Sequence, residues 1–234
     1  MVGQKWIDSI DDSMFLCDCQ DSQRDLDNAL KSRIAKKNAK LFQKVINSLR
    51  HSPCSFKNYK ATTEQMRHAL ESAKGFVESF LKNRYSRGLF FFGTPGTGKT
   101  HLCVAIIREI FSRSQREINR NDIKFTTITD FLTEIKESYN TSCSEKSIMD
   151  KYTGCKLLVL DDLGKEYSKG ESNTWADEKL YELIDTRYKK LLPMIITTNL
   201  GLTQLERKID SAVVSRIFEM CDGINCVWTD HRKA

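Results

Sequence analysis

The chain has 234 residues, long enough for one α/β domain with a smaller appendage, and 40% of them are hydrophobic, as in an ordinary globular protein. No apolar run is long enough to cross a membrane. Residues 1–16 lack the basic start and apolar stretch of a signal peptide, because Asp8, Asp11 and Asp12 interrupt them. We therefore expect a cytoplasmic protein with no membrane partner, in which most of the eight cysteines are reduced core residues.

The formal net charge of +6 is unevenly distributed along the chain. Residues 1–30 are acidic, whereas residues 31–87 are rich in Lys and Arg and contain Glu64, Glu71 and Glu78 as their only acids. Such asymmetry indicates a nucleic-acid or acidic-protein partner for the front of the chain. A solvated helix face explains the same pattern equally well, so both interpretations stay open.

The predicted elements fall into two parts. Apolar residues recur at helical spacing over 24–50, Ser52-Pro53 breaks the pattern, and a second helix is expected over 63–83. From residue 88 strands and helices alternate, which predicts an α/β fold with a parallel sheet between helices. The strands are expected at 88–92, 123–127, 156–160, 194–198 and 225–228, and the helices at 101–110, 128–139, 175–191, 202–209 and 211–219, with 140–150 either helix or loop and a polar insertion at 164–174.

Residues 93–100, which read GTPGTGKT, match the phosphate-loop pattern G-x-x-x-x-G-K-[ST] at every fixed position. The motif follows an expected strand and opens an expected helix, so a mere glycine turn is the weaker interpretation. Its glycines let backbone N–H groups close around phosphate oxygens, and the helix N-terminus favours negative charge. We expect Lys99 to reach the β- and γ-phosphates and the Thr100 hydroxyl to bind Mg²⁺. The expected ATP-binding residues are Gly93, Thr94, Pro95, Gly96, Thr97, Gly98, Lys99, Thr100 and His101.

A second signature, LLVLDDLG at 157–164, is an apolar strand that ends in two carboxylates. In a parallel sheet Asp161 and Asp162 emerge at the C-terminal edge, where ligands bind in open α/β folds. We expect Asp161 to bind Mg²⁺ together with Thr100, and Asp162 to polarise the attacking water. The alternative, a solvated pair of turn aspartates, is weak so soon after a complete phosphate loop.

Two later residues are candidates on weaker grounds. Asn199 follows the expected strand 194–198 and can orient a water near the γ-phosphate, although an Asn in this place is usually a turn residue. Arg216 lies in an amphipathic helix, and an arginine supplied by a second subunit can stabilise charge on a transferring phosphoryl group. From spacing alone, a surface salt bridge is the better interpretation of Arg216.

Together these motifs resemble an AAA+ ATPase, and specifically the DnaC/DnaI family of replicative helicase loaders. The resemblance covers residues 88–228 well and 15–87 more weakly, and the later motifs are far more specific than the phosphate loop. It is carried by GTPGTGKTHL at 93–102, FLTEIKESY at 131–139, LLVLDDLG at 157–164, KLYELIDTRY at 179–188, IITTNL at 195–200 and SRIFEMC at 215–221.

The resemblance implies a role for each candidate. Arg216 becomes the arginine finger that reaches a neighbouring subunit's ATP, which raises it above the salt-bridge interpretation. Asp162 stands where AAA+ proteins usually have Glu, which leaves room for slow turnover. Arg232 is the one late candidate for a sensor 2 arginine, and because the sequence stops two residues later we expect no full helical lid. The remaining assignments are Lys99 and Thr100 to Walker A, Asp161 and Asp162 to Walker B, and Asn199 to sensor 1.

The implied function is that of a loader: an ATP- and Mg²⁺-dependent ATPase that binds a hexameric, DnaB-type replicative helicase, delivers it to single-stranded DNA and self-associates through its ATP sites. Residues 1–60 would then be a small, mostly helical helicase-docking and linker region, and residues 61–234 the AAA+ ATPase domain. Some family members have a zinc-binding front domain. Here Cys17 and Cys19 remain, with His51 and Cys54 as candidate further ligands, so zinc is an alternative that the spacing does not favour.

Two rival functions stay open. A transposition helper ATPase of the IstB kind shares this ATPase core and would bind duplex DNA and a transposase. A non-hydrolysing scaffold would use ATP only as a conformational ligand. The Cys17-x-Cys19 remnant and the R-I-A-x-x-N run at 33–38 favour the loader over the transposition helper, and the intact Lys99, Asp161 and Asp162 argue against lost hydrolysis.

Overall fold

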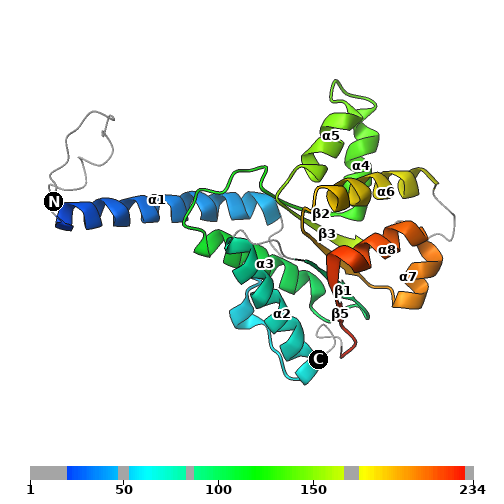
Figure 1. Ribbon diagram of the computed structural model, residues 1–234, viewed down its shortest axis with the longest axis horizontal. Coiled ribbons are helices and arrows are strands. Elements are labelled where there is room, and N and C mark those ends of the chain that lie inside the picture. The colour runs from blue at the N-terminus through cyan, green and yellow to red at the C-terminus, as the bar shows by residue number, and fades with distance from the viewer. Residues whose placement is uncertain (1–19, 47–52, 83–86, 166–173, 230–234) are drawn as a thin grey trace.

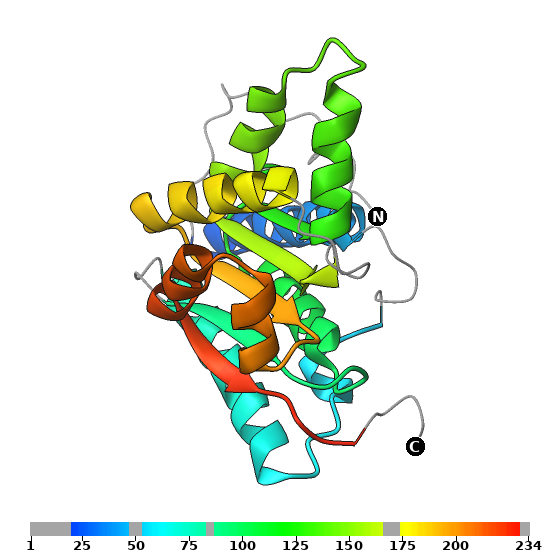
Figure 2. The ribbon, with the colours of Figure 1, turned by 90° about the vertical axis from the view of Figure 1, so that its right-hand side faces the viewer.

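In the computed structural model, which describes residues 20–46, 53–82, 87–165 and 174–229, five strands form one sheet in the order β2-β3-β4-β1-β5 (Figure 1). Every pair of neighbours is parallel, and Figure 2 shows the strands from a second side. The sheet confirms the α/β class expected from the alternation of strands and helices. The strands are β1 (Gly88–Phe92), β2 (Ile123–Thr127), β3 (Leu157–Leu163), β4 (Met194–Thr198) and β5 (Cys221–Asn225).

Helices cover both faces of the sheet (Figures 1 and 2). One face carries α1 (Gln20–Ile46), the short 3₁₀ helix η2 (Phe56–Asn58), α2 (Glu64–Leu81) and α3 (Lys99–Arg113). The other face carries α4 (Ile128–Ser138), α5 (Glu145–Thr153), α6 (Thr174–Lys189), α7 (Leu202–Lys208) and α8 (Ser211–Met220). The region 140–150, for which helix and loop were both open, is therefore a loop followed by α5.

Alternation along each strand divides the core into two halves. Successive side chains of a strand point to opposite faces, so in β1 Phe90 packs among the helices α4 to α8, whereas Leu89 and Phe91 pack against α1 to α3. Since both faces are covered, the central strands are apolar at nearly every position, as in other doubly covered parallel sheets.

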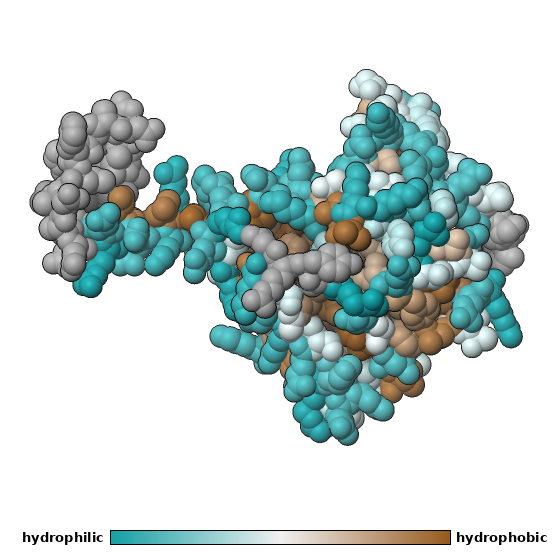
Figure 3. Space-filling model, in the orientation of Figure 1, coloured by the Kyte–Doolittle hydropathy of each residue, from teal (hydrophilic) through white to brown (hydrophobic). Residues whose placement is uncertain are grey.

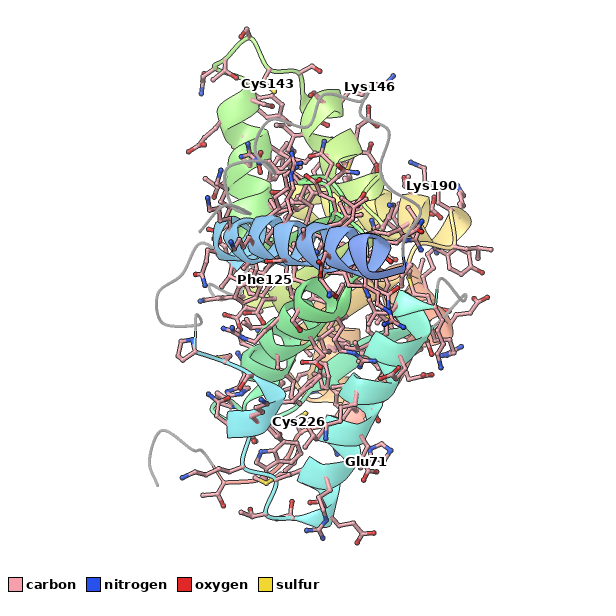
Figure 4. The ribbon with its side chains drawn as sticks, turned by 90° about the vertical axis from the view of Figure 1, so that its left-hand side faces the viewer. Glu71, Phe125, Cys143, Lys146, Lys190 and Cys226 are labelled. Carbon is pink, nitrogen blue, oxygen red and sulfur yellow. The ribbon has the colours of Figure 1, made fainter. Side chains whose placement is uncertain are left out.

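Helix α1 is attached to the body by its second half only. Phe42 and Ile46 are buried, and Phe125 of β2 belongs to the same cluster, beside α1 in Figure 4. The amide of Asn38 donates to Arg116 O at 3.2 Å and its oxygen accepts from Ile118 N at 3.1 Å. The first half projects from the body (Figure 1). The predicted helix 24–50 thus begins earlier, at Gln20, and its predicted end lies beyond the described residues.

The last predicted strand was wrong: it is Cys221–Asn225, and not 225–228. The apolar run Cys226 to Trp228 suggested the later position, whereas β5 is a half-exposed edge strand in which Asp222 and Gly223 leave no apolar pattern. Its register is set by β1, with Gly88 opposite Cys221 and Phe92 opposite Asn225.

Arg87 joins the end of α8 to the start of β1. Helix α8 passes directly into β5, so the last carbonyl groups of the helix lie next to the residue that precedes β1. The Arg87 guanidinium donates to Phe218 O at 2.8 Å, to Glu219 O at 2.5 Å and to Cys221 O at 2.9 Å, and it pairs with Asp222. One cation therefore satisfies carbonyl groups that a helix C-terminus leaves without partners.

None of the helices within the described ranges combines the length and the apolar character that a membrane span requires. Most of the polar insertion predicted at 164–174 lies outside those ranges.

Candidate nucleotide site

The predicted site residues converge at the C-terminal edge of the sheet. The loop 93–98 joins β1 to α3, Asp161 and Asp162 lie near the end of β3, and Asn199 follows β4. Strands β1, β4 and β3 are neighbours and parallel, so their ends meet at one edge. Residues that are 100 positions apart in the sequence thus form one site.

Three glycines give the loop its path. Gly93, Gly96 and Gly98 have φ angles of 128°, 79° and 89°, in the region that side-chain-bearing residues rarely adopt. A Cβ on Gly93 would lie 2.5 Å from the carbonyl oxygen of Cys226, so this position also has no room for a side chain. Gly98 is the N-cap of α3, and the loop therefore presents a helix N-terminus to the site.

Lys99 is held at the centre of the loop. It is 5% exposed, and its ammonium group donates to Gly93 O at 3.0 Å and Thr94 O at 2.6 Å and lies 3.4 Å from Thr97 Oγ1. The loop carbonyl groups thus keep a positive charge where it can meet the oxygens of a bound phosphate.

Thr100 and Asp161 form the best-defined pair in the site. Thr100 Oγ1 lies 3.0 Å from each carboxylate oxygen of Asp161, and Asp161 is 4% exposed. Thr197 Oγ1 donates to Asp161 Oδ1 at 2.5 Å and fixes the carboxylate from the side of β4. A hydroxyl beside a buried carboxylate is the kind of hard oxygen set that Mg²⁺ prefers, so these residues fit the expected metal.

A bulge directs the second aspartate. The pairing of β3 with β4 shifts between Leu160 and Leu163, and Asp162, in between, has a φ of 60°. Its backbone N–H donates to Thr197 Oγ1 at 3.0 Å. Bulges of this kind re-aim side chains beside functional sites. As a result, the side chains of Asp161 and Asp162 both contact residues at the same edge of the sheet, Thr100 and Asn199 respectively.

Asn199 binds the re-aimed aspartate. Its side-chain amide donates to Asp162 Oδ1 at 3.1 Å, and Lys165 Nζ lies 3.4 Å from Asp162 Oδ2. The structure therefore brings together Asn199 and Asp162, which the sequence analysis assigned to the same water. It also adds Lys165, which sequence reasoning did not select.

Segments from both ends of the described chain close around the loop. Trp228 Nε1 donates to Thr97 O at 2.9 Å. The Tyr59 ring packs on the ring of His101, with 5.5 Å between centroids, and limits the space beside Gly98. Cys226, labelled in Figure 4, packs with its backbone against Gly93. None of Tyr59, Trp228 and Thr197 was selected from the sequence, because no motif marks them.

His101 is turned away from the centre of the loop. Its Nε2 lies 2.9 Å from Ser55 O, and burial raises the pKa of the neighbouring Tyr59 hydroxyl. The Tyr59 hydroxyl has no hydrogen-bond partner within the described part of the chain. His101 thus joins the first turn of α3 to residues 55–59.

Arg216 is engaged within its own chain. Its Nε donates to Asp185 Oδ1 at 2.9 Å, and its terminal nitrogens donate to Ala212 O at 3.0 Å and to the Tyr181 hydroxyl at 3.1 Å. The structure therefore gathers Arg216 with α6. The predicted phosphate-loop residues, Asp161, Asp162 and Asn199 lie instead at or beside the ends of β1, β3 and β4.

The remaining candidates fall mostly outside the described residues, as is the case for Arg232, Cys17, Cys19 and His51. Cys54 is described: it is buried, and its carbonyl accepts a hydrogen bond from Arg108 at 2.7 Å. Among the residues with known positions, no three His, Cys, Asp or Glu side chains come together as a metal-binding group.

Residues 30–228 match the family model described as IstB-like ATP binding protein. The chain belongs to this family of IstB-like ATP binding proteins. In sequence, the chain is 27% identical over 168 residues to the replicative helicase loader DnaC of Escherichia coli (strain K12). That alignment covers 71% of this chain and 64% of DnaC, so the chain spans somewhat less than two thirds of its relative.

Solved structures agree with this family assignment. The crystal structure of the DnaC helicase loader matches with a TM-score of 0.65 and 28% identity, over 77% of this chain and 100% of that one. The crystal structure of DnaI matches in fold, with a TM-score of 0.64 and 22% identity over 79% and 94% of the two chains. The expected resemblance to DnaC and DnaI is confirmed, and the fold of this IstB-like protein is that of an AAA+ P-loop ATPase.

Proposed function

We propose that this protein hydrolyses ATP and uses the cycle to load a hexameric, DnaB-type replicative helicase onto single-stranded DNA. The observation that carries the proposal is the Thr100–Asp161 pair, which joins Walker A and Walker B segments 61 residues apart. The likeness to DnaC, a replicative helicase loader, supports the choice of task, because it extends over 71% of this chain and includes the fold.

Each residue has a separate task in the proposed reaction. Lys99 and the loop N–H groups hold the phosphates, and Thr100 and Asp161 would hold Mg²⁺, which would supply positive charge beside the phosphates. Asp162 accepts a proton from the attacking water, and Asn199 keeps the Asp162 carboxylate in place. The side chain of Asp is one carbon shorter than the usual Glu, so we expect slow turnover.

The site is completed by a second subunit in this proposal. Arg216 donates to the ATP of its neighbour, and self-association through ATP sites follows. The ATPase rate per subunit should then rise with protein concentration, which a self-contained site would not show.

The proposed docking region is residues 1–60, with the ATPase domain at 61–234. On α1, Leu26 and Leu30 are 39% and 53% exposed, and they lie one turn apart on the projecting half, where Figure 3 shows brown patches. Lysines and arginines follow from residue 31. An apolar stripe next to basic side chains suits binding to an apolar and acidic surface of a helicase. We assign the protein, with this partner, to the cytoplasm.

Capture of the helicase from the native host tests the proposal. The tagged protein should retain a ring-shaped helicase, Leu30→Asp should lose it, and Ala35→Asp, an exposed control on the same helix, should keep it. Single-stranded DNA should alter ATP turnover at low salt, where phosphate contacts are not screened. If neither the wild type nor the Ala35→Asp control retains a helicase, and if single-stranded DNA does not change ATP turnover, the loader proposal is refuted.

The runner-up is a transposition helper ATPase, which the description of the matching family model favours. Such a protein would coat long duplex DNA as a filament and bind a transposase. Electron microscopy with duplex DNA and ATP, beside the helicase capture, separates the two. If the protein forms filaments on duplex DNA and does not capture a helicase, the transposition-helper function would replace the loader proposal.

A further inference from the structure

Asp185 of α6 is the principal partner of Arg216. Its Oδ1 accepts from Arg216 Nε at 2.9 Å, and its Oδ2 pairs with Lys189 at 2.7 Å. The side chains of Asp185 and Arg216 are 12% and 24% exposed, so the pair is largely shielded from water. A hydrogen bond from Lys189, together with the charge of Arg216, lowers the pKa of Asp185 and keeps the carboxylate ionised.

Two tyrosines restrict the guanidinium further. The rings of Tyr181 and Tyr188 lie 5.0 Å and 5.7 Å from the guanidinium carbon, and the Tyr181 hydroxyl accepts from a terminal nitrogen. The carbonyl of Ala212, one turn earlier on α8, accepts from the other terminal nitrogen. An arginine that otherwise samples many rotamers is thus fixed from several sides.

This set of contacts leaves part of the donor surface unused. A guanidinium has five N–H groups, and within the described residues Arg216 uses one on each of its three nitrogens. The others lie on the two terminal nitrogens, which together can bind an anion such as phosphate with two parallel hydrogen bonds. The Arg216 side chain is 24% exposed, so part of it is accessible to a second molecule.

We infer that Asp185 is the positioning residue of Arg216: it holds the Nε edge of the guanidinium so that the terminal N–H groups are offered to the phosphates bound by a neighbouring subunit. The inference rests on the proposed action of Arg216 in trans. Positioning matters for catalysis because donors that are already oriented need no reorganisation during the reaction. A merely structural ion pair between α6 and α8 would make a different prediction, since it would affect folding and not the reaction of the neighbour.

Subunit mixing tests this directly. Lys99→Ala keeps Arg216 but loses the lysine of its own site, and Arg216→Ala keeps its own site but loses the finger. Each variant should be nearly inactive alone, and an equimolar mixture should regain ATP turnover. The donor is then changed to Lys99→Ala with Asp185→Asn. Turnover should fall about 10- to 100-fold with the KM for ATP unchanged, as expected for a misplaced catalytic group.

Matched variants keep the result interpretable. Glu182→Gln removes another acid of α6 and, combined with Lys99→Ala, should donate as well as Lys99→Ala alone. Asp185→Asn by itself should still bind a fluorescent ATP analogue, which shows that the subunit is folded. Asp185→Glu keeps the negative charge but has a longer side chain, which should displace the guanidinium of Arg216. A Lys99→Ala subunit with this change should therefore also restore less turnover in the mixture, although the ion pair can still form.

Two outcomes would overturn the inference, and they are distinguishable. Full donation by both Asp185 variants would show that Asp185 does not position Arg216, while the proposed function stands. No turnover in the mixture of Lys99→Ala and Arg216→Ala, with active wild type, would show that Arg216 does not act in trans, so both its proposed action and the inference about Asp185 would fall, while helicase capture still tests the loader.

Discussion

Asn199 donates a hydrogen bond to Asp162 across the ends of two neighbouring strands, with 3.1 Å between Nδ2 and Oδ1. Asp162 reaches this position because the bulge in β3 turns it to a φ of 60°. The contact therefore needs both the end of β3, which carries Asp162, and the end of β4, which precedes Asn199. The proposed water-activating carboxylate is therefore oriented by backbone geometry on one side and by an amide on the other.

Removal of the Asp162 carboxylate should lower ATP turnover and leave binding intact. For Asp162→Ala we expect a fall in kcat of about 100-fold or more, since general-base catalysis contributes on that order. The affinity for a fluorescent ATP analogue should stay within about threefold of wild type. Lys165→Ala, which removes the other partner of Asp162, is the control and should retain most activity. Background rates in wild type and variant alike would favour the non-hydrolysing scaffold.

The Thr100 hydroxyl should determine the Mg²⁺ concentration that is needed for half-maximal turnover. Thr100→Val keeps the shape of the side chain but cannot bind a metal or contact Asp161, so the Mg²⁺ concentration for half-maximal turnover should rise at least about tenfold. Thr100→Ser keeps the hydroxyl and should remain close to wild type. A Mg²⁺ titration of turnover in the three proteins measures this, and identical curves would remove Thr100 from the metal site.

Two glycines should respond to alanine with opposite signs. Gly93→Ala places a Cβ 2.5 Å from Cys226 O at a φ of 128°, so we expect a loss of about 1–3 kcal/mol in unfolding free energy. Gly75→Ala lies inside α2 with nothing within 4 Å of its Cβ, and it should add about 0.5–1 kcal/mol. Chemical denaturation measures both. A tolerated alanine at 93 would contradict the tight packing of the loop on Cys226.

Glu134 should make stability depend on pH in the acid range. Burial acts to raise its pKa, but hydrogen bonds from Lys151 and Tyr152 outweigh burial, so the pKa of Glu134 lies below the ordinary 4.5. A lowered folded-state pKa gives stability that is present above 4.5 and lost as the pH falls through the folded value. The stability gap between wild type and Glu134→Gln should therefore be full at pH 7 and shrink below pH 4.5.

Urea denaturation at several pH values checks the behaviour of Glu134. Glu137→Gln changes an exposed acid on the same helix and should alter stability by less than about 0.5 kcal/mol at pH 7. A gap for Glu134→Gln that stays constant down to pH 3 would rule out the proposed linkage.

The sequence predicted which residues meet at the edge of the sheet, and it did so for a local reason. A phosphate loop and a strand that ends in two aspartates need fixed residues at short spacing, so Lys99 and Asp161 could be recognised before any fold was known. The contact between Thr100 and Asp161 agrees with the rule that parallel strands end at one edge of a sheet. Apolar runs of strand length gave the boundaries of β2 and β4.

What the sequence could not predict depends on packing between distant segments. Tyr59 and Trp228 reach the loop only because the chain folds back over it, and no pattern marks either residue. Arg187 lies in the stretch 179–188, on which the resemblance to loaders was based, yet it is fully buried and donates hydrogen bonds to the carbonyl groups of Tyr152 and Pro193. Its role in the fold, and that of Asp185 beside Arg216, depend on which helix faces which.

The clamp formed by Arg87 has a mechanical consequence. Strand β1 leads into the phosphate loop, and Arg87 ties the start of this strand to the last turn of the helix that carries Arg216. The hydrogen bonds of Arg87 therefore join the proposed nucleotide site to the proposed contact with a neighbouring subunit within one chain. If subunits assemble as proposed, the angle at each junction would determine the distance from Arg216 to the neighbour's phosphates, and the ATPase rate would report how the subunits are arranged.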